Sequence, residues 1–172
     1  MIIYGDKVVL RPIEAEDAEL LRDMINSPDI ESSVVGFSFP VSKSQQETWM
    51  KNLGNRNDVF RAMIDVNGIA IGEAMLTDID YKNGTAEIHI KIADKKNRGC
   101  GYGKDTINTL TDYAFDELRL HCVYCHIRED NKASQSLFVS CGYLFEGNMR
   151  SRMFKSGKYY DLKAYSKINE DA

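Results

Sequence analysis

Two tight turns divide the middle of the chain into three strand-like runs, and they constrain the fold more than any other feature. The runs are Val59–Val66, Ile69–Ile79 and Thr85–Ala93. Asn67-Gly68 joins the first two runs, and Lys82-Asn83-Gly84 joins the second to the third. Asn-Gly pairs favour the positive φ angles of tight hairpin turns. The centre of the chain is therefore predicted to be an antiparallel meander.

Further helices and strands are predicted on both sides of this meander. Before it, the patterns predict a strand at Lys7–Pro12, a helix at Glu14–Asn26, and a helix started by a Ser44–Glu47 capping box and stopped by Gly54. After it, they predict a helix from Gly103 or Lys104, a strand at Leu120–Arg128, a helix at Asn131–Ser140, and strands at Tyr143–Arg150 and Tyr159–Lys167, turned by Ser156-Gly157.

This order of elements predicts a mixed α/β (α+β) fold. Antiparallel strands followed by a βαβ unit give a mixed, mostly antiparallel sheet of about seven strands flanked by helices. No linker or repeat interrupts the pattern, and 172 residues suit one buried core. Residues 1–172 are therefore expected to form a single domain.

Charge and hydropathy exclude several classes of protein. The formal net charge is -4, whereas a nucleic-acid binder usually carries a basic face. No apolar run reaches the roughly 20 residues that span a bilayer, and the start of the chain becomes charged too soon for a signal peptide. We therefore expect a cytoplasmic protein with no nucleic-acid or membrane partner.

The four cysteines raise the question of a zinc site, because Cys122 and Cys125 stand in the segment HCVYCH. No second pair of ligands completes a four-ligand set. The segment also reads as a strand, in which residues three apart face opposite sides. Reduced, structural cysteines and no metal are expected.

A glycine-rich loop precedes the helix that starts near Lys104. In Arg98-Gly99-Cys100-Gly101-Tyr102-Gly103, backbone N–H groups at the helix start have no internal partner, and the helix dipole adds positive charge. Glycines let a phosphate approach the backbone, and Arg98 and Lys104 add charge-assisted bonds. The loop therefore predicts a pyrophosphate site, although a plain glycine-rich helix start fits the same residues.

Motif spacing narrows the nucleotide classes. The dinucleotide fingerprint GxGxxG and the Walker loop GxxxxGK[ST] are both absent. Arg98, Gly101 and Gly103 instead fill R-x-x-G-x-G, which resembles the loop of the GNAT acetyltransferase superfamily. The segment from Asn131 through Ser134 and Phe138 to Gly142-Tyr143 resembles the second motif of that family.

The end of the chain resembles one branch of the superfamily. Glu146-Gly147 and Gly157-Lys-Tyr159-Tyr-Asp161 look like signatures of the branch that contains RimJ/RimL-type N-terminal acetyltransferases and spermidine acetyltransferases. The resemblance covers nearly the whole chain. It implies a GNAT fold in which strands 4 and 5 of the sheet splay apart and bind acetyl-CoA. Relatives include homodimers, but no segment here predicts an interface.

The resemblance also implies which residues hold acetyl-CoA. Main-chain groups of Ile90, Lys91 and Ile92 would pair with the pantetheine arm in the manner of an added strand. The candidates for the rest of the coenzyme are Arg98, Gly99, Cys100, Gly101, Tyr102, Gly103, Lys104 and Asn131. Asn131 is equally suited to cap its helix.

Amide formation from a thioester needs a base, an oxyanion donor and a group that stabilises the leaving thiolate. Glu87 matches the family base, although a solvated carboxylate on a strand is an equal reading. The Ile92 N–H is the nearest match for the oxyanion donor. Ser134 matches the RimL-type serine, which would steady the thiolate or simply leave room for the coenzyme. Phe138 replaces the usual tyrosine and has no proton to give.

The acceptor pocket is expected between the first helices and the last strands. Its candidate lining residues are Phe37, Phe39, His89, Tyr159, Tyr160 and Asp161. The leading hypothesis is an N-acetyltransferase in which a protein N-terminus, a polyamine or another small primary amine attacks acetyl-CoA directly in a ternary complex. The alternatives are a non-catalytic acyl-CoA sensor and a domain whose loop binds nothing.

Overall fold

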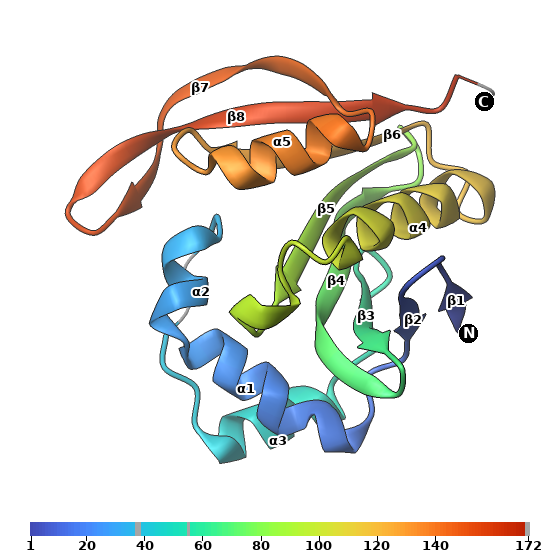
Figure 1. The fold of residues 1–172 in the computed structure, drawn as a ribbon, viewed down its shortest axis with the longest axis vertical. Helices are drawn as coiled ribbons and strands as arrows, with labels where there is room; N and C mark the ends of the chain where they lie inside the picture. The colour runs from blue at the N-terminus through green and yellow to red at the C-terminus, as the bar shows by residue number, and fades with distance from the viewer. Residues whose placement is uncertain (37–38, 55, 171–172) are drawn as a thin grey trace.

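An eight-stranded sheet forms the centre of the protein (Figure 1). The computed structural model describes residues 1–36, 39–54 and 56–170. The strand order is β1-β2-β3-β4-β5-β6-β8-β7, and only the β5–β6 pair is parallel. The mixed, mostly antiparallel sheet predicted from the sequence is confirmed, with one strand more than expected. The additional strand is the two-residue β1, which is too short to show a period.

The strands are β1 (Ile3–Tyr4), β2 (Val9–Arg11), β3 (Phe60–Val66), β4 (Ile69–Asp80), β5 (Thr85–Ile92), β6 (Cys122–Arg128), β7 (Leu144–Lys155) and β8 (Lys158–Ile168). The helices are η1 (Ala15–Asp17), α1 (Ala18–Asn26), α2 (Pro28–Ser33), α3 (Lys43–Lys51), η2 (Lys95–Asn97), α4 (Tyr102–Asp116) and α5 (Lys132–Ser140). In the described part of the chain, no helix has both the length and the apolar character needed to cross a bilayer.

Two of the three predicted tight turns are confirmed. The third, at Lys82-Asn83-Gly84, has positive φ only at Gly84 (67°) and belongs to a longer loop between the paired residues Asp80 and Thr85. Asn67 and Gly68 both have positive φ, 54° and 82°, as a primed turn requires. Ser156 and Gly157 do the same at the β7–β8 hairpin, with φ of 51° and 82°. These turns fix the antiparallel pairing of β3 with β4 and of β7 with β8.

One predicted helix start is wrong by two residues. Ser42 caps α3 by accepting from the Gln45 N–H at 3.2 Å, and the Gln45 side chain accepts from the Ser42 N–H at 2.9 Å. The predicted box used Ser44 with Glu47, but Ser42 with Gln45 satisfies the same pattern one half-turn earlier. The region after Ser27, which the sequence left open, begins with the short helix α2.

The main core lies between the sheet and helices α4 and α5. Alternate residues of β3 to β6 face these helices, and Leu76, Ile88 and Val123 are at most 1% exposed there. Ile107 and Leu110 of α4 complete this cluster. Figure 1 shows α1, α2 and α3 gathered at the other end of the molecule. The sheet is therefore flanked by helices, as predicted.

The two parallel strands in the middle of the sheet separate after three residue pairs. β5 and β6 pair at Thr85–Cys122, Ala86–Val123 and Glu87–Tyr124, and no pairing continues beyond Glu87. The residues that follow, Ile88 to Ile92 and Cys125 to Arg128, therefore line a widening gap. This is the separation that was expected between strands 4 and 5. Those strands are labelled β5 and β6 here, because the additional strand β1 precedes them.

Candidate active site

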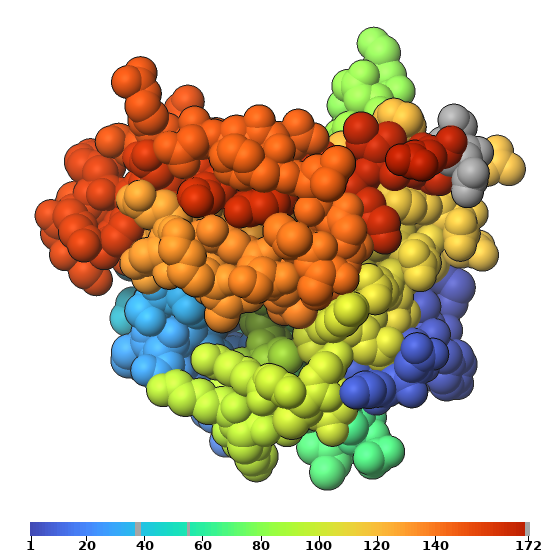
Figure 2. Space-filling model, turned by 45° about the horizontal axis from the view of Figure 1, so that its top comes forward, coloured from blue at the N-terminus to red at the C-terminus, as the bar shows by residue number. Residues whose placement is uncertain are grey.

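A cavity of about 720 Å³ occupies the gap between the splayed strands. Figure 2 shows the surface hollowed where α2, α5 and the loop of residues 93–101 meet. The cavity walls come from α2, β5, β6, α5 and the glycine-rich loop. Segments far apart in the sequence thus converge on one site.

The glycine-rich loop forms one end of this cavity. Arg98, Gly99, Gly101, Gly103 and Lys104 line it, whereas Cys100 and Tyr102 do not. Gly101 is the residue before α4 and has φ of 86°. Among the described residues, none accepts a hydrogen bond from the N–H groups at 102–104, the first turn of α4. The loop therefore offers unpaired donors and two cationic side chains to an anion.

Two glycines of the loop have backbone or packing reasons of their own. Gly101 has positive φ, which disfavours a side chain, and an added side chain would also meet Lys7 Nζ at 2.8 Å. A side chain at Gly103 would meet Leu137 of α5 at 3.2 Å. A larger residue at either position would therefore disturb the loop.

The start of the chain supports this loop. Asp105, in the first turn of α4, accepts hydrogen bonds from the N–H groups of Asp6, Lys7 and Val8 at 2.7–3.1 Å. Lys7 Nζ then donates to the carbonyl of Cys100 at 3.3 Å. The segment before β2 is therefore tied to the anion-binding end of the cavity.

The main chain of β5 faces the gap at alternate residues. Ala93 N–H donates to Ile71 of β4, so the main-chain groups of Ile92 and Ile90 point to the opposite edge, toward the gap. The carbonyl of Ile92 accepts from Arg98 Nη2 at 3.2 Å. Lys91 differs from the prediction, because its carbonyl lies against Gly72 of β4. Only its side chain lines the cavity.

Glu87 lies at the narrow end of the gap, beside two histidines. Its Oε1 is 2.8 Å from Nδ1 of His126, and its Oε2 is 3.7 Å from Nε2 of His89. The Glu87 side chain is 15% exposed and does not line the cavity, whereas both imidazoles do. The carboxylate proposed as the base thus lies behind a histidine.

His89 is also hydrogen-bonded to β4. Its Nε2 is 3.0 Å from Thr77 Oγ1. Burial lowers the pKa of His89, and the Glu87 carboxylate opposes this shift only in part. Burial therefore favours the neutral form of His89, which lines the cavity.

His126 lines the cavity, although the sequence pattern does not single it out. The alternation of β6 places it with Tyr124 and Arg128, opposite the buried Cys125. Parallel pairing of Glu87 with Tyr124 then sets His126 across from His89. The alternation of side chains along β6 can be read from the sequence, but the residue-by-residue pairing of β5 with β6 cannot.

The α5 residues from the second motif lie together on the cavity wall. Asn131 caps α5, accepting from the Ser134 N–H at 3.1 Å. Ser134 and Phe138 line the cavity, and Phe138 packs edge-on against Tyr143 with ring centroids 5.0 Å apart. The capping role of Asn131 is therefore present whether or not it also binds the coenzyme.

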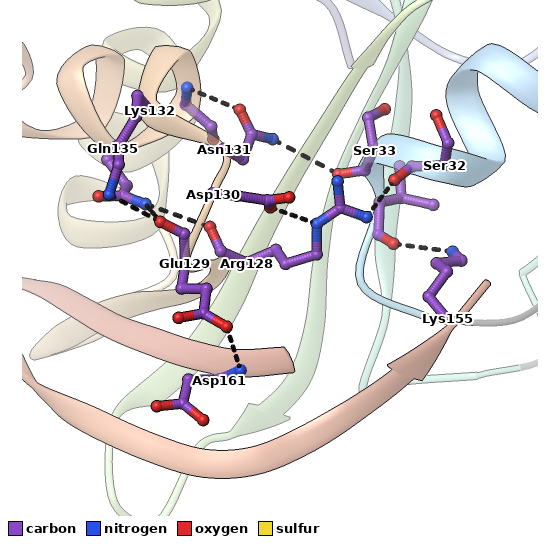
Figure 3. Close-up of polar contacts among 12 residues, drawn as sticks. Ser32, Ser33, Arg128, Glu129, Asp130, Asn131, Lys132, Gln135, Lys155 and Asp161 are labelled. Atoms are coloured by element: carbon purple, nitrogen blue, oxygen red, sulfur yellow. Dashed lines mark hydrogen bonds and ion pairs between the residues drawn. The ribbon is translucent and has the colours of Figure 1, made fainter. Parts of the chain in front are cut away.

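Helix α2 forms another wall of the cavity, and three side chains hold it in place (Figure 3). Arg128 Nη1 donates to the carbonyl of Ser32 at 2.6 Å, and Asn131 Nδ2 to that of Ser33 at 3.5 Å. Lys155 of β7 donates to the carbonyls of Glu31, Val34 and Gly36. These donors satisfy carbonyls at the end of α2 that lack helical partners.

Several predicted acceptor residues lie elsewhere. Tyr159 is 65% exposed and packs on Phe154. Tyr160 lies between Arg128 and Lys158, whose charged groups are 4.7 and 4.6 Å from its ring centroid. Neither tyrosine lines the cavity, and the 76% exposed Phe39 does not either. Phe37 lies outside the described residues.

Asp161 is also absent from the cavity lining. Its carboxylate accepts from the Ser151 N–H at 2.8 Å and from Asn148 Nδ2 at 2.6 Å, and the first of these bonds is the main reason its pKa is lowered. These bonds tie β8 to the irregular middle of β7. The structure therefore gives Asp161 a local role in the β7–β8 hairpin.

The cysteines do not form a metal site in the described residues. No group of three His, Cys, Asp or Glu side chains there is arranged to hold an ion. Cys100, Cys122, Cys125 and Cys141 are all free thiols. Burial raises the pKa of the Cys125 thiol far above its ordinary value, which keeps this cavity-lining residue protonated.

Known proteins share this arrangement. The spermidine N(1)-acetyltransferase of Vibrio cholerae is 27% identical over 159 residues, covering 92% of this chain and 91% of the relative. The uncharacterized N-acetyltransferase p20 of Bacillus licheniformis is 25% identical, covering 98% and 97%. A crystal structure of spermidine N-acetyltransferase from Vibrio cholerae in complex with CoA and spermine matches with a TM-score of 0.85 at 28% identity, covering 95% and 96%.

A family model settles the relationship that these matches indicate. The model for the acetyltransferase (GNAT) domain matches residues 7–144, which is most of the chain. The matched region includes the splayed strands, the glycine-rich loop and α5. The chain belongs to the GNAT acetyltransferase family and is an N-acetyltransferase.

Proposed function

We propose that this enzyme acetylates the primary amine of a small molecule by direct attack on acetyl-CoA in a ternary complex. The observation that carries the proposal is the gap that opens between β5 and β6 immediately after Glu87. This gap connects the glycine-rich loop within one cavity to His126, the hydrogen-bond partner of Glu87. The resemblance to a spermidine acetyltransferase over 92% of the chain supports an amine acceptor.

The residues present fit acetyl-CoA, which would supply an activated acyl group. The N–H groups at 102–104, with Arg98 and Lys104, would hold its pyrophosphate. The main chain of Ile90 and Ile92 would pair with the pantetheine arm, and the Ile92 N–H would face the thioester carbonyl. Ser134 would donate a hydrogen bond to the departing sulfur, since Phe138 has no donor.

Direct attack is favoured over transfer through a cysteine. Cys125 is the cysteine of the described residues that lines the cavity, and its buried thiol has a raised pKa. A thiol that stays protonated is a poor nucleophile. Initial-rate plots should therefore intersect, as they do when both substrates bind before transfer, and parallel lines would contradict this order.

The charges of the cavity bear on the choice of amine. The described lining includes no Asp or Glu, whereas it includes Arg61, Lys91 and Arg128. Arg61 is paired with Glu73 at 2.7 Å and Arg128 with Asp130 at 2.5 Å. A polyamine needs anionic partners for its remote ammonium groups. The acceptor panel must therefore contain monoamines and N-terminal peptides beside spermidine.

The test is release of free CoA thiol from acetyl-CoA with each amine of the panel. We expect amine-dependent release with at least one small primary amine. The enzyme is used in catalytic amounts, so that its own thiols, including the exposed Cys100, add little to the thiol signal from released CoA. Binding of acetyl-CoA without release for any amine would favour the acyl-CoA sensor instead. Release only with N-terminal peptides would move the acceptor class to proteins.

A further inference from the structure

The side chains nearest the opening of the gap are two histidines rather than a carboxylate. Glu87 and Tyr124 are the last paired residues of β5 and β6, so His89 and His126 are the next residues on the same face of each strand. Both imidazoles line the cavity, and Glu87 does not. An amine entering from the α2 side would meet an imidazole before it met the carboxylate.

The hydrogen bond between Glu87 and His126 fixes which nitrogen of the imidazole is free. A carboxylate only accepts, so His126 Nδ1 carries the proton that is donated to Glu87 Oε1 at 2.8 Å. In the neutral ring, Nε2 then carries the lone pair. No described residue forms a hydrogen bond with His126 Nε2. This is the protonation pattern of an imidazole ready to accept a proton.

The second histidine is less suited to that task. His89 Nε2 already bonds Thr77 Oγ1 at 3.0 Å and lies 3.7 Å from Glu87 Oε2. Burial lowers the pKa of His89, which disfavours its cation. His89 therefore contributes a neutral wall rather than a proton acceptor.

We propose that His126 is the general base of the acetyl transfer and that Glu87 is the residue that positions it. This assignment rests on the proposed function. The ammonium of the acceptor gives one proton to His126 Nε2, which later passes it to solvent. The amine nitrogen forms a bond to the acetyl carbon while the carbon–sulfur bond breaks. The second nitrogen proton leaves with the thiolate, so the products are the amide, CoA thiol and one released proton.

Other charged and titratable groups lie on the strands near His126. They are Glu87, His89 and Lys91 of β5, Tyr124 and Arg128 of β6, Asp78 of β4, and Arg61 with its partner Glu73 on β3 and β4. Arg61 and Arg128 are each ion-paired. The paired side chain on β8 is Ala164, which is not titratable. Glu87 is the carboxylate in direct contact with the imidazole.

Two variants separate a base from a structural support. In His126→Asn, the amide nitrogen can replace Nδ1 as a donor to Glu87, but nothing replaces Nε2. We expect kcat to fall by about 100-fold or more, with loss of the acidic limb of the pH–rate profile. In Glu87→Gln, we expect a smaller fall in kcat. Its acidic limb should remain but move to lower pH, because the imidazolium loses the carboxylate that stabilises it.

The opposite pattern would overturn the assignment. If His126→Asn kept the acidic limb and Glu87→Gln lost it, Glu87 would be the base. CoA affinity, measured by calorimetry, should stay the same in both variants, which shows that the fold and the coenzyme site are intact.

A readout without turnover keeps this test separate from the proposed function. Nitrogen-15 NMR of the three histidines reports which ring nitrogen carries the proton, and His126→Asn identifies the signal. We expect protonated Nδ1 and unprotonated Nε2 on His126 at pH 8. A protonated Nε2 would sink the assignment, whereas absence of turnover with every amine would instead sink the proposed function.

Discussion

Individual glycines decide how closely a ligand can approach the loop. Gly101 combines φ of 86° with a neighbour, Lys7 Nζ, at 2.8 Å from the position of a side chain. A β-branched residue in this backbone region costs roughly 1–2 kcal/mol before any clash. A larger residue at Gly101 should therefore distort the loop, and its effect on the coenzyme must be compared with that of an equal strain elsewhere.

We expect Gly101→Val to raise the Kd for CoA by about tenfold or more, which corresponds to about 1.4 kcal/mol. Calorimetric titration with CoA measures this directly. Gly54→Val is the matched control, because Gly54 has nearly the same positive φ, 87°, has nothing within 4 Å of the added atom and does not line the cavity. Equal CoA affinity in the two variants would contradict the role given to the loop.

At the residue scale, the sequence predicted best where the signal was local. Gly99, Gly101 and Gly103 lie where the motif places them, at the start of α4. His126 was missed because its role depends on β5 pairing with β6 from Glu87 and Tyr124 backward. A register between strands 37 residues apart in the chain leaves no mark in either strand alone.

Among the elements, α2 depends most on distant side chains. Six residues are too few to form a stable helix in isolation. Lys155, which is 9% exposed, donates to three carbonyls at its end and pairs with the Glu31 carboxylate at 3.0 Å. One β7 side chain therefore holds this wall of the cavity in place.

We expect Lys155→Met to destabilise the protein by about 1–3 kcal/mol, because three carbonyls lose their charged donor and Glu31 loses its ion-pair partner. The KM for the acceptor should rise while the KM for acetyl-CoA changes little. Denaturant unfolding and steady-state kinetics measure the two effects. Lys158→Met on the same hairpin should change neither, since Lys158 is exposed and contacts Tyr160. Equal stability and equal acceptor KM in the two variants would contradict the role given to Lys155 in holding α2.

Elements with strong periods were predicted closely, and irregular ones were not. β3, β4, β5, α4 and α5 lie within a few residues of their predicted bounds. Tyr159, Tyr160 and Asp161 were wrongly predicted to line the acceptor pocket. The register shift in β7 between Met149 and Met153 affects where the side chains of this hairpin point. Asp161 supports that irregularity, and no pattern in the sequence predicts a bulge of this kind.

In the whole molecule, the sheet is interrupted between β5 and β6. A ligand that fills this gap adds contacts that the unfolded chain cannot make. At 100 times its Kd, CoA should stabilise the fold by about 2.7 kcal/mol. For a chain of this size, that raises Tm by about 5–10 °C.

A thermal shift series with CoA tests this expectation, with adenosine as a control that lacks the pyrophosphate. An unchanged Tm at saturating CoA would favour the domain whose loop binds nothing.

Fold class and family could be predicted over nearly the whole chain, because the order of elements and two motifs agree. The amine could not, because its pocket is assembled from loops and side chains of several elements.

The bonds from Asp105 to the first strand region have a practical consequence. The N–H groups of Asp6, Lys7 and Val8 donate to the Asp105 carboxylate in the first turn of α4. The Lys7 side chain donates to the Cys100 carbonyl in the adjoining loop. We therefore expect an affinity tag fused at Met1, or removal of the first eight residues, to weaken coenzyme binding. Purification handles belong at the other end, after β8, which lies away from the glycine-rich loop.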